Sequence, residues 1–419
     1  MIRRTGVQSS SGEKASPNKE GPPQGQLTWQ AVQTWGEADR RTQVTCIDVI
    51  SSSMSKADGM ATVLVGRKNG RMNVIRVDRL TGMLDTSTVV TRDLVDVKGR
   101  NMYEKDDGGT SISAIHGVVL PSVADVESGR PGGEGTGHLE REDDGMLVCV
   151  VTRNGIVRFY DMALENELGQ FSCPPQVTCA AYHAPSRQLA IGCEGAELKV
   201  YTLEWQEEGK ANTKKPKLDG KKVAAGESHS TVSGTLTYSA KGGKPDKVGF
   251  CDKPWNSAIV FNPTVEYGSQ IIVATGHGKL RLYDTKVGKR PQLNVPFQER
   301  RITSLSPDTK HNVWWVADAE GNMQSYDVKA GKFQGAIKGV SGSIRSTDIH
   351  PTLPFIVSGG LDRYVRIHST RTRTAVMRLY MTSQLCVVRW LGSQEEEAPP
   401  GDTEKNASKR TKKGKKRKA

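Results

Sequence analysis

The sequence lacks the residue patterns that mark most enzymes, metalloproteins and membrane proteins. Its seven cysteines include no Cys-x-x-Cys pair, and its eight histidines show no spacing typical of a metal site. No P-loop, His-Glu-x-x-His, Gly-x-Ser-x-Gly or paired-carboxylate arrangement occurs. No apolar run approaches the ~18 residues of a membrane-spanning helix. These absences predict a non-catalytic intracellular protein with reduced cysteines and without a metal, a cofactor, a small-molecule substrate or a membrane contact.

Acidic residues are missing near the C-terminal end, and this changes the meaning of the overall charge. The formal net charge is +13, but residues 405–418 hold nine Lys or Arg and no Asp or Glu. Removing these nine from the 59 basic residues leaves 50 against 46 acidic ones, so residues 1–404 carry a net charge of +4. A nearly neutral body argues against nucleic-acid binding by the whole surface.

The basic tail is expected to act in nuclear or nucleolar targeting, with loose RNA contact as a further use and a purely solubilising role as the alternative. The residues that would carry the targeting signal are Lys409, Arg410, Lys412, Lys413, Lys415, Lys416, Arg417 and Lys418.

What the chain has instead of catalytic motifs is a repeated β-hairpin. Residues 353–372 show it most clearly, as an apolar run, two glycines, a polar turn at Asp362 and Arg363, and an alternating second strand. Six copies of the hairpin end at Asp78, Asp161, Thr202, Asp284, Asp327 and Ser369. The spacings of 83, 41, 82, 43 and 42 residues give a unit of a little over forty, with two double gaps. Four short strands in a period of ~40 are typical of an all-β, WD-type β-propeller.

The spacing predicts three regions in the chain. They are a disordered N-terminal segment at 1–26, a propeller at 27–392 and a disordered Lys-rich tail at 393–419. The double gaps are assigned to insertions, because these stretches are polar and poor in strand patterns. The predicted insertions lie at about 92–110, 122–145 and 206–247.

The remaining length fits seven blades, although the hairpins account for six. We expect the seventh blade to be shared, with residues 385–391 pairing with residues 27–36 so that the ring closes and loses its free edges. An eighth blade inside either double gap is the alternative.

The C-terminal half of the propeller carries a more specific signal. The stretches SGGLDRYVRIH at 358–368 and VMRLYMTSQL at 376–385, with GSIRSTDIHPTLPFIVSGG at 342–360 before them, resemble the family of WD-repeat-containing protein 74 and the NOP-seven-associated ribosome assembly factors. The resemblance is specific over 301–391 and only architectural over the N-terminal half. Three hairpins end in Tyr-Asp in place of the common Trp-Asp, so the chain is not a generic WD protein.

The resemblance implies a nucleolar, non-catalytic factor in maturation of the large (60S) ribosomal subunit. Such a factor docks on pre-60S particles through its propeller, binds other assembly factors, is released with the help of an AAA-type ATPase, and has a possible contact with rRNA. Two other classes stay open. One is a nuclear WD-type adaptor, such as a ubiquitin ligase substrate receptor or a chromatin complex subunit, and the other is an enzyme carried on a propeller.

The hairpin at 353–372 is also the candidate docking site. Asp362, Arg363, Tyr364 and Arg366 would place charge and an aromatic ring on one exposed turn, a composition favoured at protein interfaces. Arg345, on the strand that precedes this hairpin, is included as a protein or RNA contact. The structural alternative is that Asp362 only caps the turn and that Tyr364 packs between blades.

Overall fold

The computed structural model describes residues 43–50, 60–79, 83–94, 111–119, 146–205, 232–243, 249, 252–265, 267–328 and 330–391. All 24 regular elements in these ranges are β-strands. In this part of the chain, no helix has the length and apolar character needed to cross a membrane.

The strands form four-stranded antiparallel sheets, and in each sheet the strands follow one another in chain order. Blade one is β1 (Val44–Ile50), β2 (Met60–Arg67), β3 (Arg71–Asp78) and β4 (Leu84–Asp93), and blade two is β5 (Ile112–Val119), β6 (Met146–Thr152), β7 (Ile156–Tyr160) and β8 (Glu167–Ser172). Blade three is β9 (Val177–His183), β10 (Gln188–Cys193), β11 (Lys199–Trp205) and β12 (Val232–Ser239), and blade four is β13 (Asn256–Phe261), β14 (Gln270–Thr275), β15 (Lys279–Asp284) and β16 (Leu293–Pro296). Blade five is β17 (Ile302–Asp308), β18 (Val313–Asp318), β19 (Met323–Asp327) and β20 (Lys332–Ala336), and blade six is β21 (Ile344–Ile349), β22 (Phe355–Gly360), β23 (Tyr364–Ser369) and β24 (Ala375–Tyr380).

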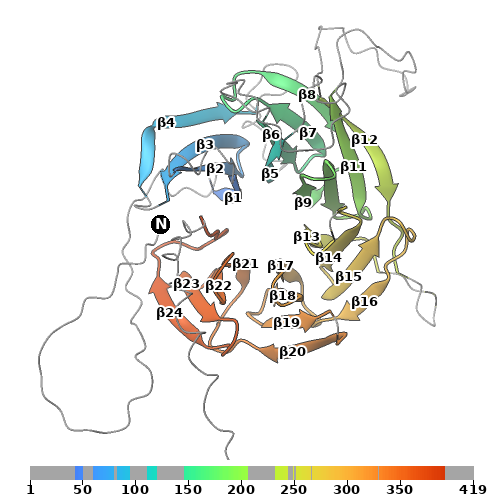
Figure 1. The fold of residues 1–419 in the computed structure, drawn as a ribbon, viewed down its shortest axis with the longest axis vertical. Helices are drawn as coiled ribbons and strands as arrows, with labels where there is room; N and C mark the ends of the chain where they lie inside the picture. Colours follow the sequence, from blue (N-terminus) through green and yellow to red (C-terminus); the bar gives the residue numbers. More distant parts are fainter. Residues whose placement is uncertain are drawn as a thin grey trace, which may run out of the picture.

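The sheets stand around a central channel like the blades of a propeller, with the first strand of each blade innermost (Figure 1). All six predicted hairpins are present, each as the second and third strands of a blade. The sequence-based prediction of an all-β, WD-type propeller is therefore confirmed.

Each blade is buried on both faces, and β18 shows how one strand serves two interfaces. Successive side chains of a strand point to opposite faces. Trp314 packs with Ile272 of blade four, whereas Trp315 packs with Ile356 of blade six. Both indoles are almost completely buried. Because removing a buried aromatic of this kind typically costs about 3–5 kcal/mol, each blade depends on its neighbours for much of its stability.

A hydroxyl group on the inner strand links four pairs of neighbouring blades. In every blade the inner strand has a register shift around its second residue. In four blades the hydroxyl at this position donates to the carbonyl of the first inner-strand residue of the next blade. The donors are Thr45, Ser113, Thr178 and Thr303, and the acceptors are Ile112, Val177, Asn256 and Ile344.

Between blade six and blade one lies a single extended stretch, residues 381–391, which we call the closing segment (Figure 1). Leu385 and Val388 pack on the apolar face of blade six, and Leu391 joins the apolar cluster of blade one. The backbone N–H of Trp390 donates to the carboxylate of Asp348 at 2.8 Å, and its indole N–H donates to the Asp348 carbonyl at 3.1 Å. The closing segment therefore occupies the place of an inner strand.

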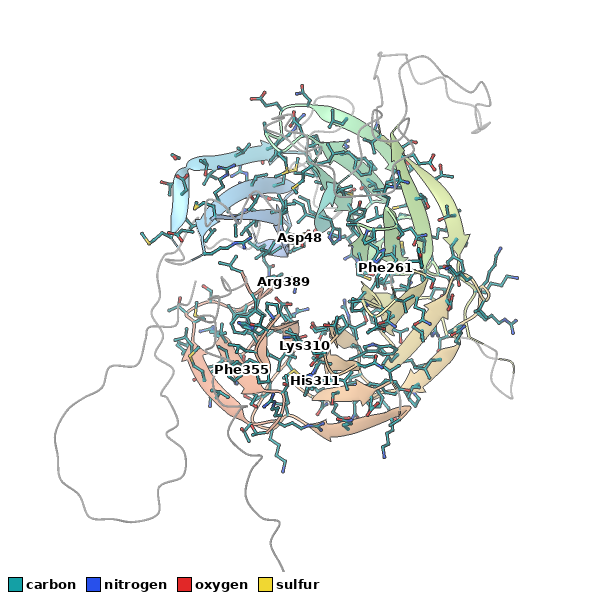
Figure 2. The ribbon with its side chains drawn as sticks, in the orientation of Figure 1. Asp48, Phe261, Lys310, His311, Phe355 and Arg389 are labelled. Atoms are coloured by element: carbon teal, nitrogen blue, oxygen red, sulfur yellow. The ribbon has the colours of Figure 1, made fainter. Side chains whose placement is uncertain are left out.

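Charge adds to this closure at the channel wall. Figure 2 shows Arg389 beside the channel, between blade six and Asp48 of blade one. Burial raises the pKa of Asp48, but a hydrogen bond and ion pair with His116 and the charge of Arg389 outweigh it and hold this pKa below its usual range. Burial raises the pKa of Asp348, and Arg389 opposes that rise. The Arg389 guanidinium thus lies between a carboxylate of blade one, Asp48, and a carboxylate of blade six, Asp348.

The structure corrects the predicted number of blades. The described residues form six four-stranded blades in place of seven, and no strand is assigned to residues 381–391. The other half of the predicted shared blade, residues 27–36, lies outside the described residues, as do the tail at 405–418 and the segment at 1–26.

Two of the predicted insertion boundaries also change. The 206–247 stretch, predicted as an insertion too poor in apolar residues for a four-stranded sheet, contains one strand, β12, which forms the outer edge of blade three. Thr235, Leu236 and Thr237 are exposed while Val232 and Tyr238 are buried, so few buried apolar residues are sufficient for an outermost strand. Likewise, β4 extends to Asp93, whose carboxylate lies 2.8 Å from Arg71.

The hydroxyl links can be tested with a pair of matched serines. Ser113 donates to the Val177 carbonyl at 2.8 Å, whereas Ser257, at the same inner-strand position in blade four, has no hydrogen-bond partner within the described residues. We expect Ser113→Ala to lower the free energy of unfolding by about 1 kcal/mol, and Ser257→Ala to leave it unchanged or raise it. Urea denaturation of the two variants provides the measurement, and an equal loss in both would contradict the assignment.

Candidate docking surface

One end of the propeller, which we call the turn face, carries the turns between the second and third strands of the blades together with the starts of the inner strands. Backbone hydrogen bonds join the two sets. Lys68 N–H donates to the Gln43 carbonyl, and Leu361 N–H donates to the Ser343 carbonyl. Arg345 is the second residue of the inner strand of blade six and Arg363 lies in the turn of that blade, so these two of the predicted docking residues lie on this face.

Asp362 and Arg366 turn inward. Arg366 is 2% exposed, and its guanidinium lies 2.5 Å from the Asp362 carboxylate. Asp362 also accepts the backbone N–H of Tyr364 at 3.2 Å. Asp362 therefore caps the turn, as the structural alternative proposed, and Arg366 neutralises it. The expectation that Arg366 shares an exposed hairpin was wrong, because both faces of a propeller blade are covered.

His368 lies on the same side of β23 as Arg366. Its side chain is completely buried, and neither ring nitrogen has a hydrogen-bond partner within the described residues. Burial, reinforced by the nearby charge of Arg366, lowers the pKa of His368 to about 4. The imidazole is therefore neutral at physiological pH.

Arg363 adopts a backbone conformation that glycine would hold more easily. Its φ is +66°, whereas the corresponding turn positions of blades one, two, four and five are Gly70, Gly155, Gly278 and Gly321, with φ between +69° and +98°. The left-handed region costs a residue with a Cβ roughly 1 kcal/mol. Strain of this kind is concentrated at functional positions, so it favours a role for the Arg363 side chain outside folding.

Around Arg363 an exposed group of rings and guanidiniums forms the rim cluster, defined as Arg363, Tyr364, Arg378 and Tyr380. The Tyr364 and Tyr380 rings meet edge to face with centroids 5.2 Å apart, and Arg378 lies 4.0 Å from the Tyr364 ring centroid. Arg363 donates to the Tyr380 hydroxyl at 3.4 Å. Tyr380 is 53% exposed. Tyr364 thus packs within its own blade, and the cluster presents two cations and a ring to solvent.

Arg345 belongs to a second group, the mouth cluster, defined as Arg153, Arg301 and Arg345. Arg301 precedes β17, and its guanidinium lies 5.6 Å from the Trp255 ring centroid. Burial, together with the positive charges of Arg345 and Arg153, lowers the pKa of Arg301. Arg153, in the turn of blade two, lies 3.8 Å from Glu194. Three blades thus direct cations to the channel mouth on the turn face.

The sequence predicts only part of these clusters. Arg378 and Tyr380 were missed, although the strand register places Tyr380 directly opposite Tyr364 and Arg378 opposite Arg366. Arg153 and Arg301 were also missed, because they are far apart in sequence and meet only when the ring forms.

The opposite end of the propeller has a cleft of about 350 Å³ between blades five and six, which includes Lys310 and His311 (Figure 2). Most of its polar groups are already occupied. The Lys310 ammonium donates to the Thr352 carbonyl at 3.0 Å, and Asp308 binds His311 at 2.8 Å while accepting backbone N–H groups of its own turn. We therefore interpret this cleft as two capped turns that are tied together.

Comparison with known proteins supports the resemblance found in the sequence. Residues 331–369 match the family described as WD domain, G-beta repeat. The chain is 28% identical to WD repeat-containing protein 74 of Bos taurus, over 64% of this chain and 64% of that protein. It is 29% identical to ribosome biogenesis protein NSA1 of Meyerozyma guilliermondii, over 62% of this chain and 67% of that protein.

The chain is similar to WD repeat-containing protein 74. The predicted resemblance is therefore confirmed, and it extends to the human protein of that name at 27% identity over 64% of each chain. The matches span just under two thirds of the length of the WD repeat-containing proteins 74. Among solved structures, the computationally designed Ika8 protein matches 82% of this chain and 76% of its own at 14% identity, with a TM-score of 0.46.

The buried His368 predicts a pH dependence of stability. Its folded-state pKa of about 4 lies below its ordinary value of 6.5, so protonation favours the unfolded chain. The stability from neutral His368 is complete above pH 6.5 and is lost as pH falls toward 4, at up to about 1.4 kcal/mol per pH unit. We expect His368→Leu to flatten the dependence of unfolding free energy on pH in this window. A slope equal to that of the unmodified protein would contradict the assignment.

Proposed function

We propose that this protein is a non-catalytic assembly factor that docks on pre-60S ribosomal particles through the turn face of its propeller. The observation that carries the proposal is the coincidence of the rim cluster with the part of the chain that most specifically resembles a ribosome biogenesis family. Arg363 retains a strained conformation there, although glycine fills the same turn position in four other blades.

The physical character of the surface fits docking better than chemistry. Arginine and tyrosine are enriched at the centres of protein interfaces, and guanidiniums pair with both phosphates and carboxylates. The ring presents them rigidly, because Tyr364, Arg378 and Tyr380 lie on the paired strands β23 and β24 and Arg363 lies in the turn just before β23. Other assembly factors are the proposed protein partners, with an AAA-type ATPase for release.

A nuclear and nucleolar location follows from the same proposal. Ribosome assembly takes place there, and the basic residues at 405–418 supply a suitable targeting signal. An adaptor outside ribosome assembly would share the fold, and it would co-purify with other nuclear complexes in place of ribosomal precursors.

The docking role can be separated from a structural role by changing Arg363 to the residue found in the other blades. Arg363→Gly should raise the free energy of unfolding by about 0.5–1 kcal/mol, because it removes strain. Combined with Arg378→Glu, it should shift the tagged protein from the pre-60S fractions of a sucrose gradient to the top. Thermal melting and gradient sedimentation measure the two effects.

The matched control is Lys289→Glu with Arg290→Glu, which changes charge on exposed residues of the turn between β15 and β16 at the other end of the propeller. The control should sediment normally. If the Arg363→Gly, Arg378→Glu protein is well folded and sediments normally, the rim cluster is not the docking surface. If the unmodified protein is absent from the pre-60S fractions, the assembly role itself is rejected.

A further inference from the structure

The mouth cluster has more cationic groups than its surroundings neutralise. Within the described residues, Arg153 pairs with Glu194 at 3.8 Å, while Arg345 is exposed and has no carboxylate partner. Arg301 is half-buried, and its guanidinium is held beside the Trp255 ring. Three guanidiniums therefore stand against one carboxylate at this place, and Arg345 is left without a neutralising partner among the described residues.

The cluster is built by contacts that cross blade boundaries. The Glu194 backbone forms a β-bridge with Trp255, on which Arg301 lies. The Thr303 hydroxyl, two residues after Arg301, donates to the Ile344 carbonyl at 2.6 Å, and Arg345 follows immediately. The three guanidiniums therefore belong to one rigid arc around the channel mouth, where Glu194 offsets only part of their mutual repulsion and a bound anion would offset more of it.

The shape of the arc favours recognition of a backbone over recognition of bases. The Trp255 ring has no free face for a stacked base. A Cβ added at Gly276 would come within 2.0 Å of the Trp255 ring, so the ring lies directly on the Gly276 backbone. The His277 ring is nearly perpendicular to the Trp255 ring, with the two ring centroids 5.6 Å apart. Arg301 lies over the ring as well. Guanidiniums bind phosphate oxygens in a bidentate manner, which suits a chain with one phosphate per nucleotide.

We propose that the mouth cluster binds the phosphate backbone of single-stranded RNA, without sequence preference, through Arg153, Arg301 and Arg345. The choice of RNA over an acidic peptide rests on the proposed function, because a pre-60S particle presents RNA. The planar guanidiniums suit the regularly spaced phosphates of such a chain.

The test is the binding of a fluorescently labelled oligouridylate to the purified full-length protein, measured by anisotropy over a series of salt concentrations. Arg153→Gln with Arg345→Gln, both at exposed positions, should weaken binding several-fold. It should also reduce the slope of log K against log salt by about 0.7 for each phosphate contact removed, or about 1.4 in total. The basic tail is the same in every variant, so the difference reports the mouth cluster.

Two further variants complete the test. Arg300→Gln is the control, because Arg300 is adjacent to Arg301 but exposed and paired with Glu320 at 2.5 Å, and it should leave affinity and slope unchanged. Arg301→Lys keeps the charge and loses the planar guanidinium, so it should weaken binding while preserving the slope.

Equal affinity and slope in the unmodified protein and the Arg153→Gln, Arg345→Gln variant would overturn the RNA contact. The RNA contact would also be overturned by a second pair of results. In that case oligoglutamate displaces the RNA from the unmodified protein, and the Arg153→Gln, Arg345→Gln variant no longer binds oligoglutamate. These results would identify an acidic protein as the partner. Neither result affects the assembly role if the unmodified protein still sediments with pre-60S particles, so the two proposals fail separately.

Discussion

Closure of the ring keeps the apolar faces of all six described blades away from water. Every blade has two apolar faces, and an open ring would leave one face of blade one and one face of blade six exposed to water. The closing segment covers both with a single extended stretch. Trp390 fixes it to Asp348, and Arg389 lies where the carboxylates of Asp348 and Asp48 attract it from either side.

Closure also brings the mouth cluster together. Arg153, Arg301 and Arg345 are distant in sequence, and they meet only because the inner strands of their blades surround one channel. The inter-blade hydroxyl bonds fix the relative height of neighbouring inner strands, so the side chains just before and after the bulges reach the same end of the ring. A nearly neutral body can therefore still concentrate positive charge at one place.

Much of the architecture was predictable because a β-hairpin leaves a local signature. Strand alternation and a turn of about three residues identified all six hairpins and their order. The strand β12 was missed because an outermost strand needs few apolar residues. The exposure of Arg366 was misjudged because alternation shows which side chains share a face, and in a propeller the neighbouring blade covers that face. The mouth cluster could not be predicted, since no local pattern shows which turns meet across a ring.

We propose that the turn face meets the ribosomal precursor, and a cryo-electron microscopy reconstruction of pre-60S particles purified through the tagged protein would test this contact. We expect the turn face, with Arg345 and Arg363, to lie against the particle and the cleft containing Lys310 to face solvent. A reconstruction in which the cleft end of the propeller is buried and the turn face is open to solvent would contradict it.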